Sequence, residues 1–323
     1  MKKLARVLDD VRATCDVRAR LAVDPVGFVR RYEDPLDREL VGLVAACVAF
    51  GNVKTIRRKL EEIFRRVEGS AEGGTSQTMT RDPPHVRAED AVAVKSALRG
   101  FRHRVFVGDD IARLLIGARA VQKRHGSLGN RFTILFASCG GMGGAEPPIP
   151  KREERKRRAL RGELEGQAPL EQDRDRDNFR EALALLCDEI RDVGQVKSKH
   201  LLADPRAGSS VKRLVLWVKW MTRPDDGVDL GLWPSVPASA LVIPVDVHIH
   251  KLSRNLGLTA RKDASWKTAV EITASLARFD REDPTKYDFS LCHMGMLQRC
   301  PSRRDPKKCE GCPVKPVCIH WDK

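Results

Sequence analysis

Residues 54–67, KTIRRKLEEIFRRV, place their apolar side chains at helical spacing and most of their charges on the other faces. The apolar positions recur every three or four residues, which puts them on one side of an α-helix. Arginines and glutamates occupy the positions that would face water. The segment therefore predicts an amphipathic helix, and its buried stripe is Ile56, Leu60, Ile63, Phe64 and Val67.

The same helical spacing recurs along most of the chain, whereas alternating strand patterns are scarce. The best strand-like run, 241–247, is short. The sequence therefore predicts an all-α fold. Four further helices are expected, at residues 111–126, 178–193, 265–279 and 283–298. The first would be capped by Asp109 or Asp110. The last would begin with an aspartate as its cap and a proline in its first turn.

Two segments have the composition of linkers. Residues 68–88 are rich in Gly, Ser, Thr and Pro, and residues 140–177 begin with a glycine-rich stretch and continue with dense charge. Such segments bury too little apolar surface to offset the entropy that ordering costs. We therefore expect both to be disordered or partly helical, and the folded helices to lie outside them.

The charge of the chain indicates a polyanionic partner. Its 59 Lys and Arg residues against 44 Asp and Glu give a net charge of +15, typical of a nucleic-acid binder, although a solvated basic surface is the alternative. The longest apolar run, 40–50, is too short to cross a bilayer, and the N-terminus lacks a secretory pattern. We expect a cytoplasmic, nucleoid-associated monomer that does not bind membranes.

Four of the nine cysteines lie close together near the C-terminus, with the spacing C-x8-C-x2-C-x5-C. A cytosolic chain rarely uses cysteines for disulfides, and a polar segment of this kind gains stability when a metal ties it down. Four thiolates suit either a [4Fe–4S] cluster or tetrahedral zinc, and the single C-x2-C knuckle favours the cluster. The expected ligands are Cys300, Cys309, Cys312 and Cys318.

A second feature is IPVDVHIH, residues 243–250, where Asp246 stands between an extended run and a helix. Alone, such an aspartate is explained as a helix N-cap. Together with the four-cysteine loop, however, PVDVH resembles the helix-hairpin-helix (HhH-GPD) DNA glycosylases of the endonuclease III superfamily. In that family a similar segment supplies the catalytic aspartate, and a C-terminal loop of four cysteines holds a [4Fe–4S] cluster. The chain looks most like a poorly characterised bacterial branch.

The resemblance implies an all-α protein of two helical lobes with DNA in the cleft between them. A six-helix lobe carrying the hairpin would span 38–246, interrupted by the two linkers. The second lobe would combine the N-terminal segment 1–37 with residues 247–323, including the cysteine loop 300–318.

The resemblance also locates the hairpin, at PRAGSSVKR, residues 205–213, where Lys212 takes the position of the lysine that bifunctional members use. The match departs from the family, because the Leu-Pro-Gly opening is missing and a serine replaces the second glycine. The 34 positions from Lys212 to Asp246 also exceed the family spacing. The implied DNA contacts are Asn52, Gly208, Ser209, Ser210, Lys251, Arg254, Arg303, Arg304, Lys307 and Lys308.

The implied activity is removal of a damaged or modified base from double-stranded DNA after the nucleotide is flipped out. Asp246 would stabilise positive charge on the sugar, and the Lys212 amine would attack it, adding lyase activity. The alternative is a non-catalytic Fe–S or zinc protein that binds nucleic acid on the same scaffold. Trp217, Trp220 and Trp233 fit a base pocket, but the helical spacing of the first two favours the core.

Overall fold

The computed structural model describes residues 2–68, 85–86, 88–141 and 171–321, and these confirm the all-α prediction. The two predicted linkers fall largely outside the described residues. In the part of the chain that is described, no helix is long and apolar enough to cross a membrane. The elements are α1 (Lys2–Ala13), α2 (Val17–Leu21), α3 (Pro25–Val29), α4 (Pro35–Val48), α5 (Val53–Val67), α6 (Ala91–Ala97), β1 (Arg102–His103), β2 (Phe106–Val107), α7 (Gly108–His125), α8 (Leu128–Ser138), α10 (Glu171–Gly194), η2 (Pro205–Ala207), α11 (Lys212–Thr222), η3 (Ala238–Ala240), α12 (Val247–Asn255), α13 (Trp266–Ala277), α14 (Asp288–Leu297) and η4 (Lys315–Val317).

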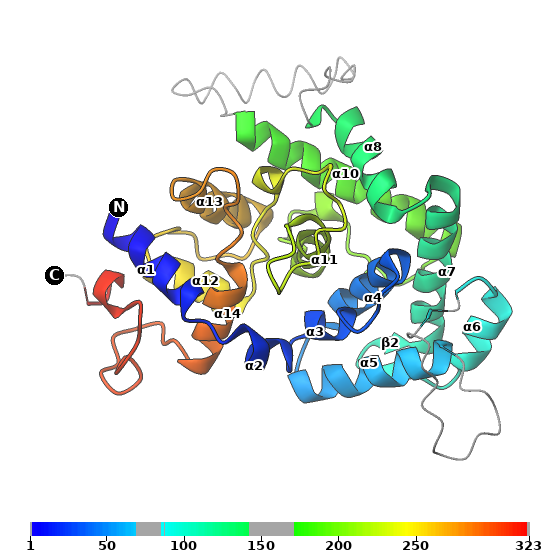
Figure 1. Ribbon diagram of the computed structural model, residues 1–323, viewed down its shortest axis with the longest axis horizontal. Helices are drawn as coiled ribbons and strands as arrows, with labels where there is room; N and C mark the ends of the chain where they lie inside the picture. The colour runs from blue at the N-terminus through cyan, green and yellow to red at the C-terminus, as the bar shows by residue number, and fades with distance from the viewer. Residues whose placement is uncertain (1, 69–84, 87, 142–170, 322–323) are drawn as a thin grey trace.

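Helix α4 is the centre of the packing, because its sequence is apolar on all sides from Leu40 to Val48 and every residue of that stretch is buried. It contacts α3, α7 and α11, and α7 in turn packs along α10 (Figure 1). Helices α7 and α10 come close together where Gly117 of α7 meets Gly194 of α10. A Cβ on Gly117 would lie 2.4 Å from the carbonyl oxygen of Ile190. Glycine is therefore required at Gly117 by packing.

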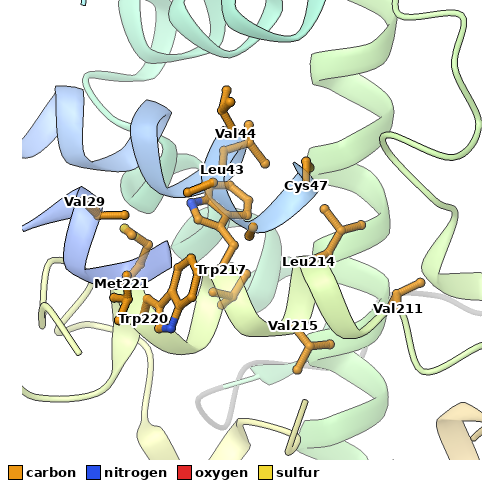
Figure 2. Close-up of a cluster of buried hydrophobic side chains, with 14 of the residues drawn as sticks. Val29, Leu43, Val44, Cys47, Val211, Leu214, Val215, Trp217, Trp220 and Met221 are labelled. Carbon is orange, nitrogen blue, oxygen red and sulfur yellow. The ribbon is translucent and has the colours of Figure 1, made fainter. Parts of the chain in front are cut away.

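The tryptophans of α11 belong to the core, as the helical spacing predicted. Trp217 and Trp220 project from α11 among buried side chains of α3 and α4, including Val29, Leu43 and Val44 (Figure 2). Trp233 is also buried, and its ring packs edge-on against that of Trp217 at a centroid distance of 5.1 Å. The three rings therefore stabilise the fold and do not form an open base pocket.

The N-terminal helix packs with the C-terminal part of the chain. Helix α1 contacts α14 and η4, and both chain ends lie on the side of the molecule that holds α12 and α14 (Figure 1). The hydroxyl of Tyr287, just before α14, donates to Asp9 of α1 at 3.0 Å. The segments at the two ends of the sequence thus form one packed region.

Helix α5 and its buried stripe confirm the prediction for 54–67, but the predicted first residues of two other helices were wrong. Helix α7 begins at Gly108, and Asp110 accepts the backbone N–H of Val107 from inside the first turn. Helix α14 begins at Asp288, because the carboxylate of Asp280 accepts the N–H groups of residues 282 and 283 and holds that stretch in turns.

The best strand-like run of the sequence, 241–247, does not form a strand. Residues 241–246 are irregular, and the backbone N–H of Ile243 donates to the side chain of Thr273 at 2.9 Å instead of to a neighbouring strand. The strands that do form, β1 and β2, have two residues each, too few to show alternation in the sequence. Helix α10 begins at Glu171, inside the predicted linker 140–177.

Candidate active site and cysteine cavity

Asp246 occupies the N-cap position of α12. Its Oδ1 accepts the backbone N–H groups of His248 and Ile249 at 2.9 and 2.8 Å, which fixes the orientation of the carboxylate. The side chain is half-buried, whereas the next residue, Val247, is 75% exposed. The carboxylate therefore sits at the edge of the folded core, beside an apolar side chain that faces solvent.

Lys212 begins α11 directly after a left-handed turn. The preceding residue, Val211, has φ of 38°, which is unusual for a β-branched residue, and its side chain is buried. Tertiary packing therefore imposes the turn. The hydroxyl of Ser210 donates to the carbonyl oxygen of Val245 at 3.5 Å, so the start of α11 is tied to the residue before Asp246.

Two side chains of α14 complete a cluster with Lys212 and Asp246, and neither was a predicted site residue. The thiol of Cys292 donates to Oδ2 of Asp246 at 3.4 Å. Asp288 lies one turn earlier, on the same face of the helix. The sequence signal for this pair is an acid and a thiol four residues apart in a mostly apolar helix.

The charges of the cluster act on one another. Burial raises the pKa of the Asp288 carboxyl, and the ammonium groups of Lys219 and Lys212 oppose that shift only in part. Burial also raises the pKa of Cys292 well above that of an ordinary thiol, and the carboxylates of Asp246 and Asp288 add to the effect. Cys292 is therefore a neutral thiol that can donate a hydrogen bond.

A buried network of ion pairs is connected to the cluster through Asp288. Lys219 is 1% exposed, and its Nζ lies 3.0 Å from Asp229 and 3.3 Å from Asp288. Burial lowers the pKa of Lys219, but the two carboxylates outweigh it and the net shift is upward, so Lys219 carries a charge. Arg223 pairs with Asp229 and, at 2.8 Å, with Asp283. The long segment between Lys212 and Asp246 thus supplies Asp229 as a buried counter-charge.

The expected hairpin pairs with another part of the chain. Gly208 has φ of 88°, a conformation that favours glycine. Ser209 forms an antiparallel bridge with Ser265, and the backbone N–H of Ser210 donates to the carbonyl oxygen of Ala264 at 3.3 Å. The amide of Ser210 is therefore not available to a phosphate, although the resemblance implied that contact.

The remaining predicted DNA contacts are spread over several elements. Asn52 caps α5, and its side chain accepts the N–H groups of Lys54 and Thr55. It comes two residues after Phe50, whose ring lies under the guanidinium of Arg213, the residue next to Lys212. The structure thus places Asn52 near the start of α11 with its side-chain oxygen already bonded.

The other basic candidates lie on α12 and on the cysteine loop. Arg254 is exposed and Lys251 is half-buried. Of the loop residues, Arg304 stacks on Trp321 at 4.1 Å from the ring centroid, and Lys308 pairs with Asp305 at 3.4 Å. Arg303 and Lys307, which completed the predicted set, are exposed as well.

The four C-terminal cysteines line one cavity. It is small, with a volume of about 10 Å³, and is bordered by the end of α12 and by the loop that carries the thiols. The side-chain N–H of Asn255, the last residue of α12, donates to the sulfur of Cys300 at 3.3 Å and to the carbonyl oxygen of Pro301 at 2.9 Å. The ligands that the sequence predicted, Cys300, Cys309, Cys312 and Cys318, are therefore brought together.

The thiols fit a metal by their chemistry. Burial raises the pKa of Cys300, Cys312 and Cys318, and the charges of neighbouring cysteines add to the shift. A cation in the cavity would remove that cost by binding them as thiolates. Within the described ranges, however, no three Cys, His, Asp or Glu side chains converge in the geometry of a metal site. The shared cavity and the mutual effects of the thiols are the features that support one.

The comparisons with known proteins place the chain in a family without an assigned activity. Residues 24–297 match the family model DUF2400, described as a protein of unknown function. No HhH-GPD or other glycosylase family matches, so the expected membership in the endonuclease III superfamily is wrong. Short motifs and a cysteine spacing are not enough to assign a chain to that superfamily. No curated protein and no solved structure matches the chain significantly. The match covers most of the chain, which therefore belongs to the DUF2400 family.

Proposed function

We propose that the protein is a DNA glycosylase, with or without lyase activity, that removes a damaged or modified base. One observation carries the proposal. Lys212 and Asp246 begin two helices whose starts are tied together, and both act on the buried carboxyl of Asp288 and the half-buried thiol of Cys292 on α14. An amine and an oriented carboxylate are the groups that cleavage of an N-glycosidic bond needs, and here their two helices start from segments that are bonded to each other.

The chemistry follows from the two groups. After it has lost a proton, the amine of Lys212 attacks C1′ of the sugar and the bond between C1′ and the base breaks. The base leaves with the electron pair and takes up the proton that the newly bonded nitrogen releases. Asp246 faces the sugar with a carboxylate that stabilises the positive charge developing there. The adduct can then open to an imine as the bond between C1′ and the ring oxygen breaks. Loss of a proton from C2′ expels the 3′-phosphate, which would cut the strand.

The substrate class is supported by charge. A net charge of +15 favours a polyanion, and Arg254, Arg303 and Lys307 are exposed on elements next to the candidate site or the cysteine loop. The exposed side chain of Val247, beside Asp246, gives an apolar contact for a sugar or a base. These features support double-stranded DNA as the substrate without identifying the base.

The four cysteines would hold a [4Fe–4S] cluster or a zinc ion, and the metal would fold the C-terminal loop. Asn255 connects that loop to α12, the helix that carries Asp246 at its other end. The bound metal would thus help to fix the position of the candidate active site. No chemical step requires it.

A second function, nucleic-acid binding without catalysis, is favoured by one specific observation. Both oxygens of Asp246 are engaged within the protein, Oδ1 by two backbone N–H groups and Oδ2 by Cys292. A purely structural N-cap would look the same. The basic surface and the metal loop would then remain as the functional parts.

The experiment that separates the two functions incubates the protein with duplexes carrying a panel of damaged and modified bases. We expect excision by the wild-type protein, loss of excision with DNA binding retained in Asp246→Asn, and a borohydride-trapped adduct that Lys212→Gln abolishes. Lys267→Gln, at the exposed start of α13, is the matched control and should keep both. Salt-sensitive binding with no excision across the panel would favour the binding function.

A further inference from the structure

The hairpin of β1 and β2 is fixed to the core by its buried side chains. His103 and Phe106, which face each other across the hairpin, are both buried. The ring N–H of His103 donates to the carbonyl oxygen of Val48 at 3.2 Å, and the ring of Phe106 packs edge-on against that of Phe50 at a centroid distance of 5.4 Å. The turn residue Arg104 is exposed. The hairpin therefore holds a basic turn in a defined position at the surface.

The turn lies close to the start of α11. The guanidinium of Arg104 is 5.4 Å from the ring centroid of Phe50, and a Cβ on Gly51 would collide with it. The guanidinium of Arg213 is 5.3 Å from the centroid of the same ring. Arg213 directly follows Lys212, so two arginines that share one aromatic ring connect the hairpin to the candidate active site.

Two further segments reach the same region. The guanidinium of Arg213 also donates to the carbonyl oxygen of His200, which brings the turn after α10 beside the ring of Phe50. Residues 51–54 continue from that ring into the first turn of α5. The exposed basic residues of the three segments form one surface, which we call the hairpin surface: Lys54, Arg102, Arg104, Lys197 and Lys199.

The charge of the hairpin surface is not balanced by the protein. The segments 50–60, 99–107 and 195–203 carry four, three and two Lys or Arg residues, and no Asp or Glu. Glu62, just beyond the first segment, pairs with Lys59 at 2.7 Å. Among the residues that the structure describes, no carboxylate lies within 4.0 Å of a basic group of the hairpin surface. Such a concentration of one charge attracts a polyanion.

We propose that the hairpin surface binds the phosphate backbone of duplex DNA beside the candidate active site. A duplex carries closely spaced phosphates along its length, which suits cations held on several segments of one face. None of the five residues belongs to the DNA contacts that the sequence indicated. The inference rests on the proposed function for the choice of DNA as the polyanion, but not for the removal of a base.

The test measures how strongly the full-length protein binds an undamaged, fluorescently labelled DNA duplex, by anisotropy at salt concentrations from about 50 to about 200 mM. The variant replaces one cation from each segment: Lys54→Gln, Arg104→Gln and Lys199→Gln. Each phosphate contact adds about 0.9 to the slope of log affinity against log salt. We therefore expect the slope to fall by about 2 to 3 and the affinity at the lowest salt to fall by about tenfold or more.

The matched control removes the same charge from exposed positions of α1, which lies on the opposite side of the molecule from β2 (Figure 1). Its substitutions are Lys2→Gln, Lys3→Gln and Arg6→Gln, and it should keep the wild-type slope. If Arg104→Gln disturbs the hairpin, the double variant Lys54→Gln/Lys199→Gln leaves the turn intact and should still lower the slope by about 2. Equal losses in the hairpin and α1 variants would overturn the proposal, as would tighter binding to an RNA duplex of the same sequence.

The proposal and the proposed function fail in different ways. Salt-sensitive binding that the hairpin variant weakens, with no base removed from a panel of damaged duplexes, would support the hairpin surface and count against a glycosylase. Base excision by the wild-type protein, with undiminished DNA binding in the hairpin variant, would overturn the hairpin surface and leave the glycosylase standing.

Discussion

The thiol of Cys292 donates to Oδ2 of Asp246 at 3.4 Å, while two backbone N–H groups of α12 bond Oδ1 of the same carboxylate. Both oxygens of Asp246 are therefore held, one by its own helix and one by α14. A carboxylate fixed from two sides loses little orientational freedom when a substrate binds. The relation makes Cys292 the simplest probe of whether that orientation matters.

Replacing Cys292 by alanine should lower the rate of base excision by about fivefold, the equivalent of one hydrogen bond worth about 1 kcal/mol. Cys292→Ser keeps a donor of similar size and should retain most of the rate. Single-turnover excision, with thermal unfolding as the check on folding, measures both variants. Equal losses in the two variants would show that the thiol acts by packing and not by its hydrogen bond.

The helices of this protein could be predicted from the sequence because their signals are local. The stripe of α5 is buried as its spacing required, and the apolar Leu40–Val48 stretch forms the central helix. Asp246 was recognisable because an N-cap is defined by its immediate neighbours. The four cysteines share a cavity because a short loop can hardly separate them.

What could not be predicted depends on contacts between distant segments. Asp288 and Lys219 are 69 positions apart in the sequence, and nothing near either residue indicates that they meet. Asp229 lies in a segment that is charged and rich in turns, features typical of a surface loop, yet it is fully buried. Charge pairs of this kind are specified by tertiary packing, so periodicity does not reveal them.

Removing Lys219 should destabilise the fold strongly. Lys219→Met leaves the buried carboxyl groups of Asp229 and Asp288 without their shared ammonium, and breaking such a pair costs about 3–5 kcal/mol. Denaturant unfolding measures the loss. The surface pair of Arg31 and Glu61, with both side chains about half exposed, is the control: Glu61→Gln should cost under about 1 kcal/mol. Similar costs for the two variants would contradict a buried network.

Substituting the cysteines should release the metal. Cys312→Ser is expected to purify with far less iron or zinc than the wild-type protein, as measured by elemental analysis, whereas Cys139→Ser, outside the cavity, should retain it. A brown wild-type protein indicates a [4Fe–4S] cluster, and a colourless zinc-containing protein refutes one. Wild-type protein free of both metals would contradict the proposed centre.

Asn255 should tune the stability of that centre. Asn255→Ala removes the N–H groups that bond the sulfur of Cys300 and the carbonyl oxygen of Pro301. Hydrogen bonds of this kind hold ligands in place, and losing them weakens metal sites by roughly tenfold or more. We expect a chelator to remove the metal faster from this variant, followed by absorbance. An unchanged release rate would show that Asn255 only ends α12.

Alkaline conditions should destabilise the fold through Cys47, a buried thiol of α4 that lies in the core of Figure 2. Burial raises the pKa of Cys47 from 9.0 to about 12, so the unfolded chain ionises this thiol at a pH where the folded protein does not. The stability that the neutral thiol contributes is fully present below pH 9 and is lost as the pH rises towards 12. At pH 10 the loss amounts to about 1.4 kcal/mol.

Cys47→Ala tests this directly, because the variant has no thiol to ionise. Its smaller side chain lowers stability at every pH, so the quantity to compare is the change in the free energy of unfolding between pH 8 and pH 10. We expect that change to be about 1.4 kcal/mol smaller in the variant than in the wild-type protein, from urea unfolding curves at the two pH values. Cys187, which burial shifts in the same direction, remains in both proteins and cancels in the comparison. An equal loss of unfolding free energy in the two proteins would contradict the prediction. It would mean that Cys47 ionises as readily in the folded protein as in the unfolded chain, despite its complete burial in α4.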